Sequence, residues 1–341
     1  GVILVTTKKG EKGEKISVMD RLIREFPESQ YVDDALFEKG RSYVLLDNNQ
    51  AAAASFEQLM RDFPQSSLAR KAGVQLGLIY FNDNQPEKAA DAYKSVISNY
   101  PGSEEAKVAL QDLKSVYIEL NDINSFAAYA NSLGGNVRFE VSEQDSLTYL
   151  AAEKLFMRGD NEGARRSLTN YLQTFPQGAF SSNANFYLAS IAFAKKDLEE
   201  AKRLFSLVLE SGDTKFREES WARKAEIEYL DKDYAAAMES FKHLQAVAEN
   251  PENKEAAKLG LMRCAELIGQ PQEALLAAND LLKEPKLSPE IMSEARYVRA
   301  KAYISLKQEN KALADLKEIA SVPSANRWRQ AKPLAADRST R

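Results

Sequence analysis

An aromatic residue followed by proline returns along this sequence at a fixed interval. The first three of these prolines, Pro27, Pro64 and Pro101, stand 37 residues apart. A fourth, Pro176, follows Pro101 by 75 residues, or two periods. A chain with such a period is built from copies of one supersecondary unit, and each copy buries its apolar face only by packing on its neighbours.

Each period also repeats one order of small and large side chains. In a count that places Gly40 at position 8, positions 8, 11, 20, 24 and 32 of the first repeat hold Gly40, Tyr43, Ala52, Phe56 and Pro64. In the second repeat the same positions hold Gly77, Tyr80, Ala89, Tyr93 and Pro101. Position 8 falls at residues 40, 77, 114, 152, 189, 225, 262 and 300. These steps of 36 to 38 residues predict about eight repeats.

Two blocks of apolar residues at helical spacing fill each period, with a short polar turn such as 47–49 between them. Spacings of three and four residues are typical of amphipathic helices. Pro86 and Pro271 stand where a second helix should begin, and proline suits the first helical turn. Small residues at positions 8 and 20 let two helices approach closely, and the large residue at position 24 fills the space against the neighbouring repeat. The pattern therefore predicts an all-α array.

This arrangement resembles the tetratricopeptide repeat, a helix–turn–helix unit of about 34 residues. The resemblance covers about residues 16–320, and repeat six adds Trp221 four residues before its position 8. It implies a right-handed solenoid whose first helices line a concave groove that binds a protein or peptide. The slightly longer period and the Phe-Pro-x-Ser joints are similar to the subgroup in bacterial cell-envelope proteins, such as the Tol-Pal coordinator and the lipoprotein of the outer-membrane assembly machine.

The array divides at a pair of glycines. Gly134 and Gly135 should end a helix. The alternation of Val137, Phe139 and Val141 is typical of a short extended segment. We therefore expect a non-repeat leader over 1–15, a first half over 16–133, a joint over 134–141, a second half over 142–320 and a disordered basic tail over 321–341.

The first ten residues, from Gly1 to Gly10, alternate weakly and are rich in β-branched side chains. They resemble the end of the plug domain in SusC-like TonB-dependent outer-membrane receptors of Bacteroidota. A receptor of that kind needs many amphipathic strands, and the pattern that follows predicts helices. We interpret the string as a junction or assembly artefact, with an ordinary leader as the alternative. We also expect repeats to be missing on at least one side.

Composition and charge narrow the function. The single cysteine and single histidine exclude a disulfide framework and a zinc site built on Cys/His clusters. Residues 1–15 carry +2 and residues 322–341 carry +4, so the total of −4 leaves −10 on residues 16–321. Such an acidic body disfavours nucleic-acid binding. No stretch approaches 18 apolar residues, so no transmembrane segment is expected.

No catalytic, cofactor or metal site is predicted. A catalytic His243 would need a nucleophile and an orienting acid, and we interpret it as a surface or partly packed residue on the second helix of repeat six. Cys264 lies within the first helix of repeat seven and is interpreted as a buried thiol rather than a reactive one. An enzyme would require a catalytic domain lost from the parent chain.

The remaining candidates are aromatic residues on the predicted groove face. Position 5 holds Phe37, Tyr149, Phe186 and Tyr297, and position 12 holds Phe156, Phe193 and Tyr229. Aromatic side chains bury a large area at low entropic cost and often anchor interfaces. The alternative for position 12 is packing between adjacent repeats. The basic and Asn-rich set that clamps a carboxylate in some relatives is not evident, because its places are taken by Val74, Leu78, Gln111 and Ser115.

Together these features predict a non-catalytic protein–protein interaction scaffold. Its ligand is a protein or peptide held in the groove, most strongly over repeats four to six. The alternatives are a structural or assembly subunit of a bacterial outer-membrane or periplasmic complex, and the binding fragment of a larger enzyme or receptor. The envelope-type joints favour a periplasmic or outer-membrane-associated location over the cytoplasm.

Overall fold

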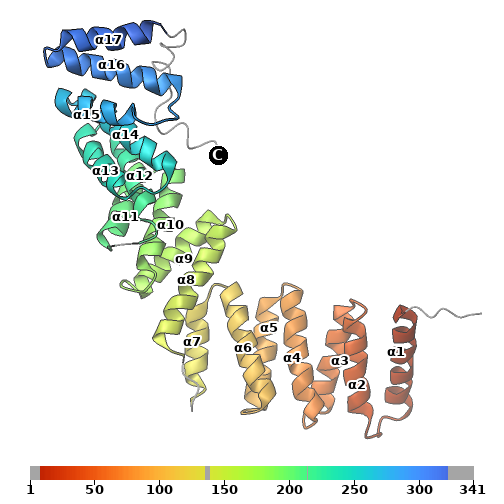
Figure 1. Ribbon diagram of the computed structural model, residues 1–341. Coiled ribbons are helices and arrows are strands. Elements are labelled where there is room, and N and C mark those ends of the chain that lie inside the picture. The colour runs from red at the N-terminus through yellow and green to blue at the C-terminus, as the bar shows by residue number, and fades with distance from the viewer. Residues whose placement is uncertain (1–7, 135–138, 213, 322–341) are drawn as a thin grey trace, which may run out of the picture. The chain divides into compact units, whose positions relative to one another are not determined.

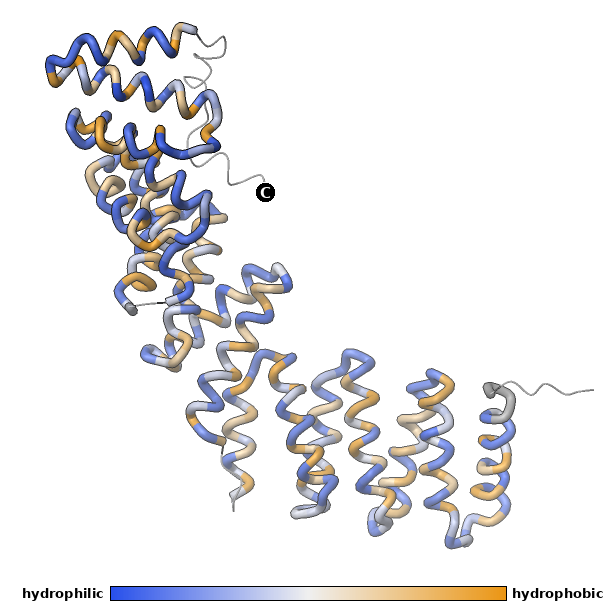
Figure 2. The backbone as a smooth tube through the Cα atoms, viewed as in Figure 1, coloured by the Kyte–Doolittle hydropathy of each residue, from blue (hydrophilic) through white to orange (hydrophobic). Residues whose placement is uncertain are grey.

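The computed structural model describes residues 8–134, 139–212 and 214–321. Within these ranges the chain forms seventeen α-helices and no strand (Figure 1). Apolar and polar residues alternate along each helix (Figure 2), so each presents an apolar stripe to its neighbours. The all-α repeat fold predicted from the sequence is therefore confirmed.

After α1 (Lys8–Glu25), the described helices form eight pairs, and each pair is one repeat. The first helices are α2 (Val32–Val44), α4 (Ser67–Asn82), α6 (Glu104–Glu119), α8 (Val141–Met157), α10 (Ser181–Ala194), α12 (Arg217–Leu230), α14 (Pro251–Leu267) and α16 (Pro289–Ser305). The second helices are α3 (Asn49–Asp62), α5 (Pro86–Asn99), α7 (Ile123–Ser132), α9 (Asn161–Thr174), α11 (Leu198–Glu210), α13 (Tyr234–Val247), α15 (Pro271–Leu281) and α17 (Glu309–Ala320). Position 8 falls on every first helix and position 20 on every second helix.

The turn inside each repeat has one backbone conformation. Position 15 takes a positive φ in all eight repeats, at Asp47, Asn84, Asn121, Gly159, Lys196, Lys232, Gly269 and Lys307. A left-handed residue at this point ends the first helix. At position 16, Asn48 and Asp197 then accept hydrogen bonds from backbone N–H groups of α3 and α11, which caps the second helix. Pro86 and Pro271 open α5 and α15, as predicted.

The proline joints between repeats end one helix and cap the next. Phe63 ends α3, and Ser66 caps α4 by accepting a hydrogen bond from the Leu68 N–H. The Tyr100 hydroxyl donates to the carbonyl of Pro64 at 2.9 Å, so one joint is bonded to the next. These contacts explain why the joint has a constant sequence form.

Glycine at position 8 lets an aromatic ring of the second helix lie against the first helix. A Cβ added to Gly40 would lie 2.6 Å from the Phe56 ring, and one added to Gly77 would lie 2.5 Å from the Tyr93 ring. The position 24 ring thus packs first on its own repeat. Phe241 reaches Gly260 of the following repeat, so the predicted contact with the neighbour also occurs.

Helix α1 begins earlier than the sequence predicts. The second helix of a preceding unit was expected from residue 16, but the chain is helical from Lys8, inside the predicted leader. The helix lies against the first repeat, where Lys15 Nζ donates to Glu38 Oε2 of α2 at 2.8 Å. Residues 1–7 of the SusC-like string lie outside the described residues.

The described residues pack into two bodies that divide between Lys154 and Leu155, inside α8. Gly134, with a φ of +69°, follows α7 as expected for a glycine at a helix end. Of the predicted extended segment, Val137 is outside the described residues and Val141 begins α8. The predicted halves over 16–133 and 142–320 stay a prediction. The predicted tail beyond Ser321 lies outside the described residues.

Candidate functional site

Positions 5 and 12 lie on one face of each first helix, because seven residues are close to two turns. Six of the predicted aromatic residues are half-buried, so each keeps part of its surface open to solvent. They are Phe37, Phe156, Phe186, Phe193, Tyr229 and Tyr297. The exception is Tyr149, which is only 1% exposed. Its hydroxyl donates to Glu153 Oε1 at 2.6 Å, one helical turn away, so Tyr149 belongs to the core.

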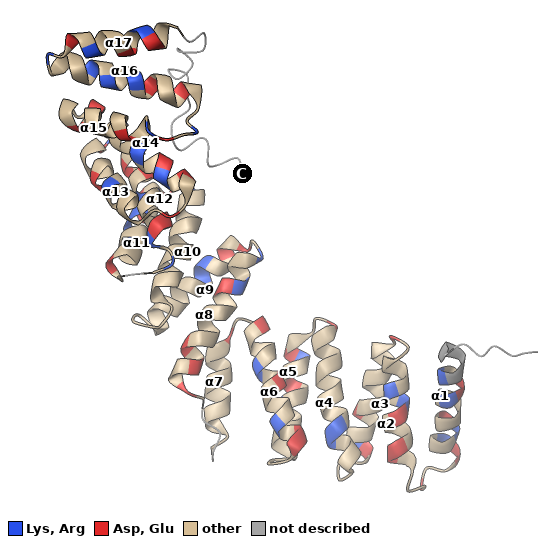
Figure 3. Ribbon diagram, viewed as in Figure 1, with Lys and Arg blue, Asp and Glu red and all other residues tan. Residues whose placement is uncertain are grey.

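Phe186 on α10 belongs to an aromatic cluster. Its ring stacks on Phe216, just before α12, with centroids 4.1 Å apart, and meets the edge of Phe205 at 6.0 Å. Tyr187 also contacts Phe186 and packs on Phe156 at 4.6 Å. Helix α10 carries no Asp, Glu, Lys or Arg, as its tan ribbon shows (Figure 3). The structure thus brings Phe156 and Phe186 into one apolar patch.

The other position 12 rings pack beside charged or aromatic neighbours. The Arg223 guanidinium of α12 lies over the Phe193 ring at 5.0 Å, and Tyr229 meets Tyr234 at 5.4 Å. Burial raises the pKa of the Tyr229 hydroxyl. Phe193 contacts the following repeat, so packing between repeats accounts for part of its surface. Part of Phe193 remains exposed to solvent.

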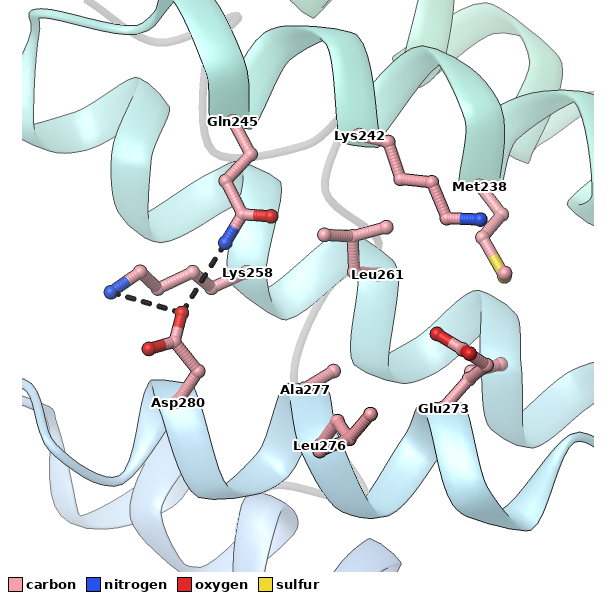
Figure 4. Close-up of a pocket in the computed structure, with 10 residues that line it drawn as sticks. Met238, Lys242, Gln245, Lys258, Leu261, Glu273, Leu276, Ala277 and Asp280 are labelled. Atoms are coloured by element: carbon pink, nitrogen blue, oxygen red, sulfur yellow. Dashed lines mark hydrogen bonds and ion pairs between the residues drawn. The ribbon is translucent and has the colours of Figure 1, made fainter.

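Sequence reasoning missed two cavities on another face of the first helices, about a third of a turn from positions 5 and 12. One is lined by α9, α10 and α11 and has a volume of about 540 Å³. The other, of about 220 Å³, is lined by α13, α14 and α15 (Figure 4). In the second cavity Lys258 and Gln245 both reach Asp280, at 3.3 Å each. The signal for both stood in the sequence, because position 11 is Ala192 or Ala265 where the first two repeats have tyrosine.

Other chemistry is sparse along the described part of the chain. His243 is exposed and stacks on Trp221, with ring centroids 4.3 Å apart. Within residues 8–134, 139–212 and 214–321, no group of three His, Cys, Asp or Glu side chains is placed to hold a metal ion. Among the same residues, no helix has the length and apolarity needed to cross a bilayer.

Comparison with known families adds to this geometry. A family model described as tetratricopeptide repeat matches residues 34–66 and 71–103. A second model of the same description matches residues 149–216. Each of these segments thus matches the tetratricopeptide repeat. Repeats of this family generally serve as protein–protein interaction scaffolds rather than as enzymes. The matched segments include Phe37, Tyr149, Phe156, Phe186 and Phe193.

Solved structures give more distant matches. A tetratricopeptide repeat protein from Parabacteroides merdae is 16% identical, with 78% of this chain and 98% of that chain covered and a TM-score of 0.29. The PilF protein of Pseudomonas aeruginosa is 14% identical, with 77% and 96% covered and a TM-score of 0.35. MamA is 14% identical, with 53% and 93% covered and a TM-score of 0.37. Likeness at this level carries no functional information. No curated protein sequence matches the chain.

Cys264 tests the interpretation of a buried thiol in the seventh repeat. It is fully buried in α14, and burial raises the pKa of the thiol from 9.0 to about 12. Because only the thiolate reacts, labelling by a disulfide reagent at pH 8 should be about 1,000-fold slower in the folded protein than in urea. Cys264 is the single cysteine of the chain, so the labelling rate reports this site alone. Equal rates in both states would contradict the packing of α14.

Proposed function

We propose that this chain is a non-catalytic scaffold that binds an extended peptide or a partner helix along positions 5 and 12 of its first helices. The half-exposed aromatic rings of the C-terminal body support the proposal most directly. Phe156 and Phe186 share a patch around Tyr187, and Phe193 and Tyr229 continue the same face on α10 and α12. Half-buried aromatic rings held by their neighbours lose little entropy when a ligand covers them.

The chemistry of this face favours an apolar ligand with acidic neighbours. Arg223 lies over Phe193, and Lys196 lies over the same ring at 5.8 Å. Arg223 is also bonded to Glu219 and Glu226 of its own helix. A ligand carboxylate beside an apolar anchor could therefore meet a cation that its neighbours already hold in place.

Phe193→Ala is expected to weaken binding of a captured partner by about 10- to 100-fold, which corresponds to about 1–3 kcal/mol for one anchoring ring. Phe193 is half-buried, so removal of its ring should leave helicity near that of the parent protein. Calorimetry measures the affinity and circular dichroism the helicity. Leu313→Ala, at an exposed leucine of α17, is the matched control and should bind like the parent. Unchanged affinity of Phe193→Ala would contradict the proposal that the partner binds along positions 5 and 12.

The envelope role is a proposal of its own, supported by the Phe-Pro-x-Ser joints and the resemblance to Tol-Pal coordinator-like repeats. It implies a periplasmic or outer-membrane-associated location in a bacterium. Cell fractionation with an antibody against this chain tests it. Recovery in the cytosolic fraction alone would overturn the envelope role and leave the scaffold proposal intact.

A further inference from the structure

Each first helix has a second face, about a third of a turn from positions 5 and 12. Positions 4, 7 and 11 share it, because their spacings of three, four and seven residues are close to whole turns. This face lies between the second helix of the preceding repeat and the second helix of its own repeat. We call the space there the outer crevice. In repeat five it is the 540 Å³ cavity between α9 and α11, lined on α10 by Asn185, Leu188 and Ala192.

A tyrosine at position 11 fills this crevice in repeats two and three. Tyr80 donates to Glu57 of α3 at 2.5 Å and lies beneath Lys88 of α5, 5.5 Å from the ring centroid. Tyr117 accepts a hydrogen bond from Lys94 of α5 at 2.8 Å, and its ring lies 6.0 Å from that of Phe126 on α7. The tyrosine ring therefore bridges the two flanking second helices.

Repeats five and seven have alanine at position 11 and an open crevice in its place. In repeat seven the crevice is smaller, at about 220 Å³, and Lys258 pairs with Asp280 on its wall (Figure 4). In repeat five the crevice is larger, at about 540 Å³, within the range of sites that hold ligands. Ala192 thus leaves the space of a tyrosine side chain unfilled.

The walls of the repeat-five crevice combine apolar and basic groups. Leu188, Ile191 and Leu204 are buried side chains that form its apolar lining. Charged lining residues are three cations and two carboxylates, namely Arg165, Lys195, Arg203, Asp197 and Glu200. Cations thus make up three of the five charged lining residues, although residues 16–321 carry −10. Glu162 pairs with Arg165 and Lys195, and Glu200 pairs with Arg203. These cations are therefore already oriented at the mouth of the crevice, where a carboxylate of a partner can share them.

We propose that the outer crevice of repeat five is a second binding site, which takes a tyrosine side chain from an acidic segment of a partner protein. The tyrosine ring would occupy the space that Tyr80 and Tyr117 fill in their own repeats. Flanking carboxylates of the partner would meet Arg165 and Arg203, which lie on the two helices either side of α10. The site is separate from the aromatic face at positions 5 and 12.

Ala192→Tyr fills the crevice with the chain's own side chain and tests the proposal. The probe is a fluorescein-labelled peptide, Asp-Glu-Tyr-Glu-Asp, followed by fluorescence anisotropy at low salt. We expect Ala192→Tyr to weaken its binding at least about tenfold, and replacement of the peptide tyrosine by alanine to do the same. The matched variant Ala265→Tyr, in the narrower crevice of repeat seven, should bind like the parent. Equal binding by Ala192→Tyr would overturn the proposal.

A second measurement uses the unmodified protein, in case Ala192→Tyr does not fold. A peptide with benzoylphenylalanine in place of tyrosine is cross-linked by light, and the attached residues are found by mass spectrometry. Cross-links on α9, α10 or α11 at the crevice residues support the site. Cross-links confined to α13–α15 or to the position 5 and 12 face would overturn it, as would labelling unaffected by an excess of the tyrosine peptide.

Discussion

Gly77→Ala is expected to lower the free energy of unfolding by about 1–3 kcal/mol, although alanine favours helices more than glycine does. The added Cβ would lie 2.5 Å from the Tyr93 ring, which is 1% exposed and has no room to withdraw. To relieve this overlap, the two helices of repeat two must move apart. That movement loosens packing along the N-terminal body. Urea unfolding followed by circular dichroism measures the change.

Gly13→Ala provides the matched control, because nothing lies within 4 Å of a Cβ at this position of α1. Alanine there should raise helix stability by about 0.5–1 kcal/mol through propensity alone. The same substitution is thus expected to have opposite signs at two glycines of one chain. If Gly77→Ala proved as stable as Gly13→Ala, close contact of α4 with the Tyr93 ring would be refuted.

The sequence predicted the repeat because its determinants are local and recur. Gly40 and Gly77 mark close helix contacts, and polar turns mark the break between paired helices. The start of α1 was not predictable in this way. Its first turns contain Lys8–Gly10, which continue a β-branched string, and the helix is stabilised by contacts such as Lys15 with Glu38 of α2. Such contacts exist only after folding.

The sequence predicted which helix face carries the candidate site residues, but not how deeply each of them is buried. Position 5 places Tyr149 and Phe186 on equivalent faces, yet Tyr149 is fully buried and Phe186 is partly exposed. Their different neighbours decide this, and a repeat count does not contain that information. The outer crevice was missed for a related reason, since Ala192 leaves a cavity only when residues of α9 and α11 also leave the space open.

Glu294→Leu should lower the free energy of unfolding by about 3–5 kcal/mol, the cost of leaving a buried partner charge unpaired. Glu294 of α16 accepts two hydrogen bonds from the Arg263 guanidinium of α14, at 2.6 and 2.8 Å. Their side chains are only 9% and 14% exposed. Without Glu294, the Arg263 guanidinium loses both bonds at a site that water barely reaches. Thermal or urea unfolding of the full chain measures the loss.

The double variant Arg263→Met with Glu294→Leu distinguishes the attraction between the two charges from the cost of burying them. Replacing both charges by apolar groups removes the desolvation cost as well as the attraction, so most of the stability lost in Glu294→Leu should return. Glu239→Leu is the control, because its pair with Lys242 is 65% and 42% exposed and such surface pairs contribute about 0–1 kcal/mol. If the double variant were as unstable as Glu294→Leu, the loss would come from misfit of leucine against α14. Recovery would instead show that the ion pair between repeats seven and eight contributes no more net stability than an apolar pair in its place.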